Sequence, residues 1–407
     1  MIRLLLVCLV LGWWSSAASA FDAGALGKPD IRLPDGPVSS TVFLISDADG
    51  WGWAERRLAF GLRAQGVAVV GIDLPDWIAR IDAGGDRCAY VVWDIEALSH
   101  QIQRAAGAAH YRSPIVAGIG AGGVLAMAIR DQAPAATLGQ ILAVDPAPAL
   151  PLTKPLCPPD PAQASMAGSG SFEVLRSGRV AATRTLDARL LGIAARAAAD
   201  DSDAPSVIEL PARPVFDTLA IVYSGDGGWR DLDRTIAGIL QRRGVPTIGI
   251  DTLRYFWARK TPVQTAEDLS RLIATYGERW GTRHVLLVGY SFGADLLPAT
   301  IAALPPMDRE KIAQVSLLGL GRTASFEISV AGWVGSDNDG APTLPDVRRM
   351  KMARVQCIFG AEDESACADL RKDGAEVIKT SGGHHFDGDY EALAEVILSG
   401  LKRRLGP

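Results

Sequence analysis

The chain lacks a long hydrophobic run, a surplus of basic residues and any clustering of cysteine or histidine into a metal-binding pattern. No apolar stretch reaches the roughly 18 residues of a membrane-spanning helix, so a polytopic membrane protein is excluded. Lys and Arg total 41 against 46 Asp and Glu, and this net charge of −5 offers no attraction to a nucleic-acid backbone. We expect no metal ion and no organic cofactor. The 407 residues, 48% of them hydrophobic, are enough for two globular domains.

Residues 1–20 have the layout of a secretory signal peptide. Arg3 precedes an apolar stretch over residues 4–14, and the small residues at 18–20 offer a cleavage site before Phe21. The alternative, an uncleaved membrane anchor, fits less well because 11 apolar residues are too few to span a bilayer. We therefore expect an exported protein whose mature chain has no transmembrane segment.

Four cysteines lie beyond this segment: Cys88, Cys157, Cys357 and Cys367. Disulfides persist in an oxidising compartment, and four cysteines allow three pairings. We favour Cys88–Cys157 and Cys357–Cys367, because each pair stays within one half of the chain. Free, buried cysteines are the alternative.

The chain repeats itself over the length of a whole domain. Residues 42–73 align with residues 220–251 at a constant offset of 178, and 116–126 align with 287–297 at an offset of 171. Among the matches are a Gly-Trp pair and a Gly-Ile-Asp triplet at the same register. A small change of offset indicates duplication followed by insertions or deletions in loops. The period is too long for a solenoid repeat.

The repeat predicts an α/β fold of two tandem domains with mainly parallel sheets. Each half alternates β-branched runs with amphipathic stretches, which is typical of a parallel sheet covered by helices on both faces. We assign residues 21–200 to the first domain, the polar and Pro-rich residues 201–214 to a linker, and 215–407 to the second domain. A shorter echo, SFEV at 171–174 and SFEI at 325–328, extends the match.

A GxSxG sequence, Gly289-Tyr290-Ser291-Phe292-Gly293, stands in the second half between the apolar run HVLLV and the helix-forming run ADLLPATIAAL. A serine on such a strand-to-helix turn is an exposed nucleophile, and the glycines avoid clashes at the turn. The alternative is a tight packing turn with an idle serine. The context favours Ser291 as a nucleophile.

The acid and the base that a serine nucleophile needs follow in the expected order. Asp363 comes just after the apolar strand predicted at 355–360, where the acid is expected. A Gly-rich loop after the next strand carries His384 and His385, two of only five histidines in the chain. We favour His384 as the base and leave His385 open as the alternative.

The oxyanion hole is expected to use the backbone N–H groups of Phe292 and Asp226. Asp226 lies in the glycine-rich segment SGDGGW, for which a plain tight turn is the alternative. In the first half Gly120 stands in place of the serine, and no histidine follows residue 110 within that half. The first domain is therefore a degenerate copy, with a role in packing, substrate shaping or partner binding.

Residues 219–407, with SGDGGW, GYSFGAD and GGHHFDGDY, resemble the catalytic domain of the VirJ/AcvB family of bacterial periplasmic proteins, within the α/β-hydrolase superfamily. The whole chain resembles the longer, AcvB-like members, which carry a degenerate duplicate in front. The resemblance implies periplasmic hydrolysis of aminoacylated phosphatidylglycerol, chiefly the lysyl and secondarily the alanyl lipid, at the outer leaflet of the inner membrane. It also implies an association with virulence and type IV secretion. It carries over the triad Ser291, Asp363 and His384.

A lysyl headgroup calls for carboxylates near the nucleophile, and the candidates are Asp226, Asp295, Asp337 and Asp339, each of which could instead serve a turn or a helix cap. The candidates for binding the lipid phosphate, or for ordinary solvated surface, are Arg230, Arg254 and Lys260. The candidates for contact with acyl chains, or for core packing, are Trp257 and Trp333. Two other functions stay open: an esterase or lipase for a different ester, and a non-enzymatic periplasmic scaffold.

Overall fold

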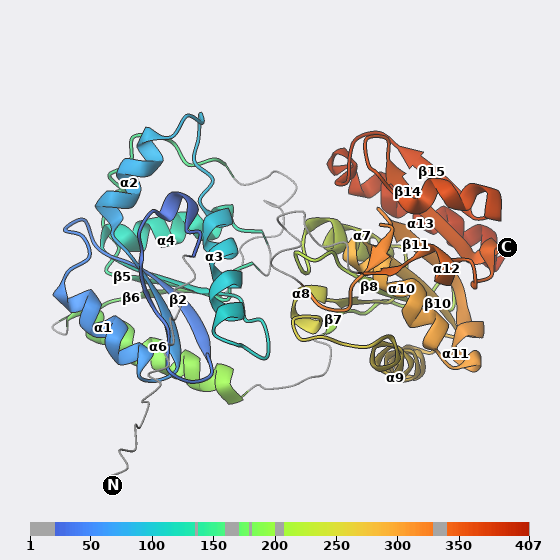
Figure 1. The fold of residues 1–407 in the computed structure, drawn as a ribbon, viewed down its shortest axis with the longest axis horizontal. Helices are drawn as coiled ribbons and strands as arrows, with labels where there is room; N and C mark the ends of the chain where they lie inside the picture. The colour runs from blue at the N-terminus through green and yellow to red at the C-terminus, as the bar shows by residue number, and fades with distance from the viewer. Residues whose placement is uncertain are drawn as a thin grey trace, which may run out of the picture.

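The computed structural model describes residues 21–134, 137–158, 171–178, 181–199, 207–328 and 340–406. They form two lobes, each built around its own sheet (Figure 1). The predicted signal peptide lies outside the described residues.

The first sheet has six strands, in the order β1-β3-β2-β4-β5-β6. Their bounds are β1 Asp30–Arg32, β2 Ser40–Ile45, β3 Val67–Ile72, β4 Ile115–Ile119, β5 Gln140–Val144 and β6 Ser171–Leu175. All neighbours pair in parallel except the edge strand β1. The helices are α1 Trp53–Arg63, α2 Leu74–Ala83, α3 Val92–Ala105, α4 Ala121–Gln132 and α6 Ala182–Ala199, and a short 3-10 helix spans Gly24–Leu26.

The second sheet has seven strands, in the order β15-β14-β11-β10-β8-β9-β7. Their bounds are β7 Val207–Leu210, β8 Thr218–Tyr223, β9 Thr247–Ile250, β10 His284–Tyr290, β11 Ile312–Leu318, β14 Val355–Gly360 and β15 Glu376–Thr380. The helices are α7 Asp231–Arg242, α8 Thr252–Tyr255, α9 Pro262–Trp280, α10 Phe292–Ala303, α11 Pro306–Lys311, α12 Leu344–Val347 and α13 Tyr390–Leu405. The 3-10 helices span Met352–Arg354, Ala366–Asp373 and Phe386–Gly388, and a small hairpin joins β12 Thr323–Ala324 to β13 Ala341–Pro342.

The two sheets correspond strand for strand, which confirms the prediction of tandem α/β domains with mainly parallel sheets. Each has an antiparallel edge strand, β1 or β7, followed by four parallel strands in the same order. β6 then takes the place of β14, and the second sheet alone continues to β15. Among the described residues, the first domain has no counterpart of the strand that precedes the histidine pair.

Two details differ from the sequence analysis. The SFEV segment forms β6, the counterpart of β14, whereas residues 325–328 lie outside any strand, so that echo is not a structural correspondence. The segment assigned to the linker contains β7, which pairs with β9 at the edge of the second sheet. Its Val-Ile-Glu-Leu sequence is half buried apart from Glu209, and the polar residues around it made this short strand hard to recognise from the sequence.

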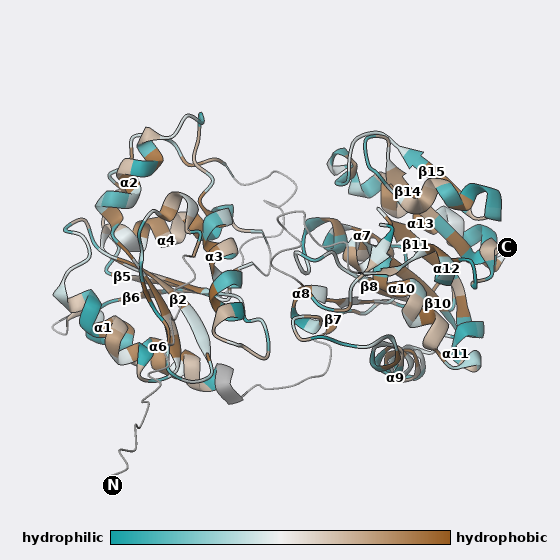
Figure 2. Ribbon diagram, in the orientation of Figure 1, coloured by the Kyte–Doolittle hydropathy of each residue, from teal (hydrophilic) through white to brown (hydrophobic). Residues whose placement is uncertain are grey.

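Helices cover both faces of each sheet because the strands are apolar on both sides. β2, β3 and β4 are buried throughout, as are β8 and β9, and hydropathy colouring shows apolar strands beneath helices that are polar on their outer faces (Figure 2). In the first domain α1 and α6 pack together on one face, as α7 and α13 do in the second. This shared layering places the nucleophile turn at the same point in both copies.

Two disulfides lie one in each domain. Cys88 bonds Cys157 with an S–S distance of 2.02 Å, and Cys357 bonds Cys367 with an S–S distance of 2.09 Å. These are the pairings that the sequence favoured. Among the described helices, none combines the length and the apolar character needed to cross a bilayer.

Candidate active site

Ser291 occupies a sharp turn between β10 and α10. Its φ of 50° and ψ of −118° lie in a left-handed region that residues other than glycine rarely adopt. The backbone N–H of Ser291 donates to the carbonyl oxygen of Leu318 at 2.8 Å, which ties the turn to the end of β11. The turn thereby projects the serine side chain from the carboxyl edge of the sheet.

The glycines on either side of Ser291 are required by close backbone approaches. A Cβ on Gly289 would lie 2.5 Å from the carbonyl oxygen of Gly293, and one on Gly293 would lie 2.5 Å from that of Tyr223. No side chain fits at these distances. The GxSxG spacing is thus imposed by the contact of α10 with β8 and β10.

The structure brings Ser291, His384 and Asp363 together from three separate loops. His384 Nε2 lies 2.9 Å from Ser291 Oγ, and His384 Nδ1 lies 3.0 Å from a carboxylate oxygen of Asp363. The Asp363 side chain is 15% exposed and that of His384 is 39% exposed, so the histidine is open to a substrate while its partner is shielded. A nucleophile, a base and an orienting acid require this chain of contacts.

His385, the alternative base, points elsewhere. Its Nδ1 lies 2.9 Å from the hydroxyl of Tyr290, and burial together with the neighbouring His384 lowers the pKa of its imidazole. The Tyr290 hydroxyl also donates to the carbonyl oxygen of His384 at 3.4 Å. His385 and Tyr290 therefore support the loop that carries His384.

Further glycines make room for the histidine loop, and the sequence analysis missed them. Gly319 adopts a φ of 63°, and a Cβ there would come 2.8 Å from the ring of His384. A Cβ on Gly360 would lie 2.2 Å from the carbonyl oxygen of Gly383. The signal that could have identified them is a glycine at the end of each of β11 and β14. Several loops meet at this carboxyl edge of the sheet, and a side chain at either position would clash with them.

The first copy keeps the backbone geometry of the nucleophile turn, but an aspartate side chain occupies the space beside it. Gly120, which replaces the serine, has a φ of 55° and a ψ of −120°, close to the values at Ser291. One carboxylate oxygen of Asp47 accepts N–H bonds from Ala48 at 2.7 Å and Ala121 at 2.8 Å. A Cβ on Gly120 would lie 2.1 Å from the other oxygen of Asp47. The Ala48 and Ala121 amides beside Gly120 form a cradle for a negatively charged oxygen, and in the first copy the side chain of Asp47 occupies this cradle.

The same register identifies the counterparts in the second domain. Ala48 aligns with Asp226, Ala121 with Phe292, and Asp47 with Gly225. Gly225 is packed against the nucleophile turn, because a Cβ on it would lie 3.7 Å from the Cβ of Ser291. The second copy therefore presents the same amide positions without the aspartate that occupies them in the first.

Asp295 lies on the first turn of α10, close to Ser291. One of its oxygens accepts the N–H of Gly321 at 2.6 Å. Burial, reinforced by the nearby charges of Asp226 and Asp363, raises the pKa of Asp295 to about 8. Three carboxylates thus face the nucleophile region, although no described cluster of His, Cys, Asp or Glu is arranged to hold a metal ion.

The structure treats the remaining candidates differently. Asp337, Asp339 and Trp333 lie outside the described residues. Trp257 is buried and contacts the first domain, so the packing alternative holds for it. The three basic candidates already have partners within the protein: Arg230 pairs with Glu96, Arg254 pairs with Asp251, and Lys260 Nζ lies 5.0 Å from the centre of the Tyr255 ring.

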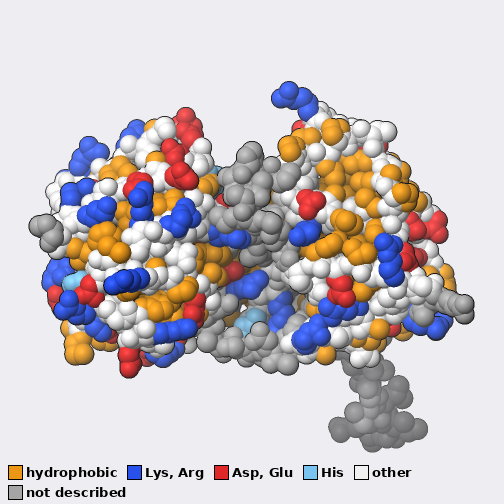
Figure 3. All heavy atoms as spheres, turned by 180° about the vertical axis from the view of Figure 1, so that it is seen from behind, with side chains coloured by type: hydrophobic (Ala, Val, Ile, Leu, Met, Phe, Trp, Pro, Cys, Tyr) orange, Lys and Arg blue, Asp and Glu red, His pale blue; other side chains and the backbone are white. Residues whose placement is uncertain are grey.

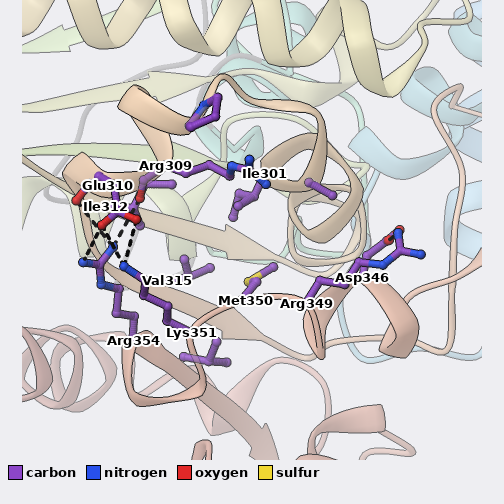
Figure 4. A pocket seen from close by; sticks show the side chains of 13 residues that line it. Ile301, Arg309, Glu310, Ile312, Val315, Asp346, Arg349, Met350, Lys351 and Arg354 are labelled. Atoms are coloured by element: carbon purple, nitrogen blue, oxygen red, sulfur yellow. Dashed lines mark hydrogen bonds and ion pairs between the residues drawn. The ribbon is translucent and has the colours of Figure 1, made fainter.

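A separate pocket opens at the opposite edge of the second sheet, where β11 and β14 begin (Figure 4). Lys351 and Arg354 at its rim both pair with Glu310, at 2.7 and 3.5 Å. Arg349 pairs with Asp346 at 2.7 Å. Arg309 also lines the pocket, so four basic residues stand against two acidic ones there, and the pocket lies away from Ser291.

Comparisons with known proteins show what the chain is similar to. Residues 217–405 match the model of the bacterial virulence protein (VirJ) family. No curated protein matches the chain. Similar solved structures are Est1E from Butyrivibrio proteoclasticus (14% identity, TM-score 0.34, covering 48% of this chain and 90% of that one) and the Pyrococcus furiosus esterase Pf2001 (12%, 0.39, 50% and 92%). Another is a serine hydrolase without a lid from Xanthomonas campestris (14%, 0.34, 50% and 96%). The match to the VirJ family model thus covers the second domain, a little under half of the chain.

Proposed function

We propose that the protein is a serine carboxylic-ester hydrolase with Ser291 as nucleophile, His384 as base and Asp363 as orienting acid. The observation that carries the proposal is the contact chain itself, with 2.9 Å between Ser291 and His384 and 3.0 Å between His384 and Asp363. The match to the VirJ family model and the α/β-hydrolase fold agree with a hydrolase.

In this mechanism Ser291 Oγ attacks the ester carbonyl while His384 Nε2 accepts the hydroxyl proton. The amides of Phe292 and Asp226 stabilise the oxyanion of the tetrahedral intermediate. The arrangement at Asp47 supports this pair, since the aligned amides of the first copy converge on one carboxylate oxygen. His384 then protonates the departing alcohol, and a water molecule that it activates releases the acid from Ser291.

The substrate that we propose is the aminoacyl ester of lysyl-phosphatidylglycerol, with the alanyl lipid as a second substrate. The resemblance to VirJ and AcvB implies this lipid, and cleavage would return phosphatidylglycerol and a free amino acid. The acidic side chains of Asp226 and Asp363 near the nucleophile support a cationic acyl group, because opposite charges attract strongly in a partly desolvated site. Asp295, whose pKa is raised to about 8, adds its charge only above that pH.

We place this activity in the periplasm, after cleavage of the signal peptide proposed at residues 1–20. The Cys88–Cys157 and Cys357–Cys367 disulfides support an oxidising compartment. The lipid ester would then be met at the outer leaflet of the inner membrane.

Lipid analysis tests the proposal. Purified mature protein and its Ser291→Ala variant are incubated with lysyl- and alanyl-phosphatidylglycerol, and free amino acid and phosphatidylglycerol are measured. Release by wild type alone is expected. Cleavage of a simple activated ester without release from either lipid would overturn the lipid assignment. If neither reaction occurs and Ser291→Ala fully complements a deletion strain, the non-enzymatic scaffold replaces the hydrolase.

A further inference from the structure

We propose that the first domain positions the oxyanion turn of the second: Glu96 holds Arg230, and Arg230 holds the turn that carries the Asp226 amide. The inference rests on the proposed hydrolase function, in which that amide is an oxyanion donor. It assigns the degenerate copy a task in the reaction of its neighbour.

Arg230 contacts both the oxyanion turn of its own domain and the first domain. Its Nε donates to the carbonyl oxygen of Gly227 at 2.7 Å, the residue after Asp226. Its guanidinium group pairs with the carboxylate of Glu96 on α3 of the first domain. The Glu96 side chain is only 7% exposed, so water competes little for this ion pair. The turn is thus held from one side by a buried charge of the other domain.

The other acidic groups near Arg230 do not replace Glu96. Asp231, Asp233 and Asp251 lie close to it, and all three belong to the second domain. Burial raises the pKa of Asp233 and Asp251, that of Asp233 well above its usual value. Each also has a structural task, because Asp233 accepts the N–H of Arg230 and Asp251 that of Arg254. Glu96 is therefore the counter-charge supplied from outside the second domain.

A second set of contacts joins α3 and the segment that follows it to α8 and the segment that follows it, and this holds the helix that carries Glu96 against the second domain. Figure 1 shows these helices facing each other across the boundary between the lobes. Trp257 Nε1 donates to the carbonyl oxygen of Ala108 at 2.9 Å, and the guanidinium of Arg104 lies 3.9 Å from the centre of the Trp257 ring. Arg254 donates to Ser113 Oγ at 2.9 Å.

The boundary between the domains carries charged side chains of both signs. Seen from behind, Lys and Arg side chains gather where the two lobes meet (Figure 3). Arg104 and Arg230 belong to opposite domains, and each pairs with a glutamate of the other, Glu327 and Glu96 respectively. The two pairs differ in one respect: only Arg230 also bonds to the turn at Gly227.

The duplication shows that the device is specific to the catalytic copy. The residue aligned with Arg230 in the first domain is Gly52, which has no side chain to reach a turn. The turn of the first copy is held instead by its own Asp47, which bonds to the amides of Ala48 and Ala121. The second copy has lost that internal brace at Gly225, and the Glu96–Arg230 pair takes over the task of fixing the turn.

Kinetics of the full mature chain on a p-nitrophenyl ester test the inference. Glu96→Gln removes the charge but keeps the shape, and we expect kcat to fall about tenfold with KM within about twofold, a part of the 10²–10³-fold loss on removing an oxyanion donor. Arg230→Lys keeps the charge but loses the planar Nε bond, so kcat should fall likewise. Glu327→Gln is the matched control, since it breaks an ion pair at the same boundary but leaves the turn untouched.

Hydrogen–deuterium exchange over residues 225–229 gives a readout that needs no activity. Exchange should be faster in Glu96→Gln and Arg230→Lys than in wild type or Glu327→Gln. Unchanged exchange in both variants would overturn the inference, as would a kcat within twofold of wild type or an equal loss in Glu327→Gln. If the wild type cleaves no ester, only the proposed hydrolase function is overturned. Hydrogen–deuterium exchange would still decide whether Glu96 holds the turn.

Discussion

Ser291 holds a backbone conformation that costs about 1–3 kcal/mol for a residue with a side chain. The surroundings impose it: the Ser291 N–H bonds to Leu318, and Gly289 and Gly293 leave no room to relax. Gly120 in the first copy adopts nearly the same φ and ψ, where a glycine bears no such cost. The strain is therefore confined to the copy that carries a nucleophile.

Gly225→Asp transplants the internal anion of the first copy into the second. We expect the new carboxylate to take the amides of Asp226 and Phe292 and to lower kcat by at least about 100-fold, comparable to the loss of an oxyanion donor. Gly225→Ala is the control, because its Cβ makes the same contact with the ring of Tyr290, at 3.2 Å, but brings no carboxylate. Ester hydrolysis and circular dichroism measure both, and equal activity of the two variants would contradict the account of the cradle.

The histidine pair separates by substitution. His384→Ala should lower kcat/KM at least about 10 000-fold, because removal of a triad base costs nearly as much as removal of the whole triad. His385→Ala should lower it less than about tenfold, since His385 bonds to Tyr290 and not to Ser291. Steady-state hydrolysis of an activated ester provides the measurement, and a reversed order would assign the base to His385.

Asp295 makes the selectivity for a cationic acyl group depend on pH. Its pKa of about 8 means that the carboxyl is neutral below pH 8 and charged above it. Attraction for a lysyl ammonium should therefore grow as pH rises, and KM for the lysyl lipid relative to a neutral ester should fall between pH 7 and 9. Asp295→Asn should abolish this relative trend. A trend that persists in the variant would remove Asp295 from substrate binding.

At the scale of elements, the duplicated Gly-Trp motif builds the same corner twice. Trp51 and Trp229 each follow a glycine with positive φ, and each ring lies over the glycine of the next strand, Gly71 or Gly249. A Cβ on Gly71 would lie 2.1 Å from one ring, and one on Gly249 would lie 2.2 Å from the other. This shared packing fits the constant offset of 178 between the first strands, turns and helices of the two copies.

Alanine at these two glycines should destabilise the domains separately. Gly71→Ala and Gly249→Ala each overpack a corner, which costs about 1–3 kcal/mol of folding free energy. Only Gly249→Ala should also lower kcat, because Trp229 ends the turn that carries Asp226. Urea denaturation measures the loss of stability and ester hydrolysis the loss of activity. An equal activity loss in both variants would show that the effect on kcat does not arise from the turn at Trp229.

At the scale of the whole molecule, the two domains share apolar contacts as well as ion pairs. Tyr111 of the first domain is 4% exposed and belongs to the apolar core of the second. Its ring lies 5.2 Å from that of Trp257, which is 1% exposed. Buried aromatic contacts of this kind couple the stabilities of the domains, so we expect wild type to unfold in one transition.

Trp257→Ala should break that coupling. Loss of a buried tryptophan costs about 3–5 kcal/mol, and part of this cost falls on the boundary between the domains. Calorimetry should then resolve two unfolding transitions. Trp93→Ala is the control, because Trp93 is 63% exposed. This variant should still unfold in a single transition. A single, merely lowered transition in Trp257→Ala would show that the domains are coupled through other contacts.

The sequence by itself determined the duplication, the alternation of strands and helices and the nucleophile turn. These features depend on neighbouring residues or on a repeat in register, and both can be read along the chain. Ser291, Asp363 and His384 were also within reach, because each follows the end of an apolar strand, and parallel strands deliver their ends to one edge of a sheet.

Only the tertiary structure decided which histidine faces Ser291, what fills the cradle of the first copy and what the first domain contacts. The choice between His384 and His385 depends on the direction of adjacent side chains in one loop. The ion pair of Arg230 with Glu96 joins residues 134 positions apart, which no local pattern encodes. Such contacts form when whole domains dock, so their physical cause lies in the packing of the two lobes.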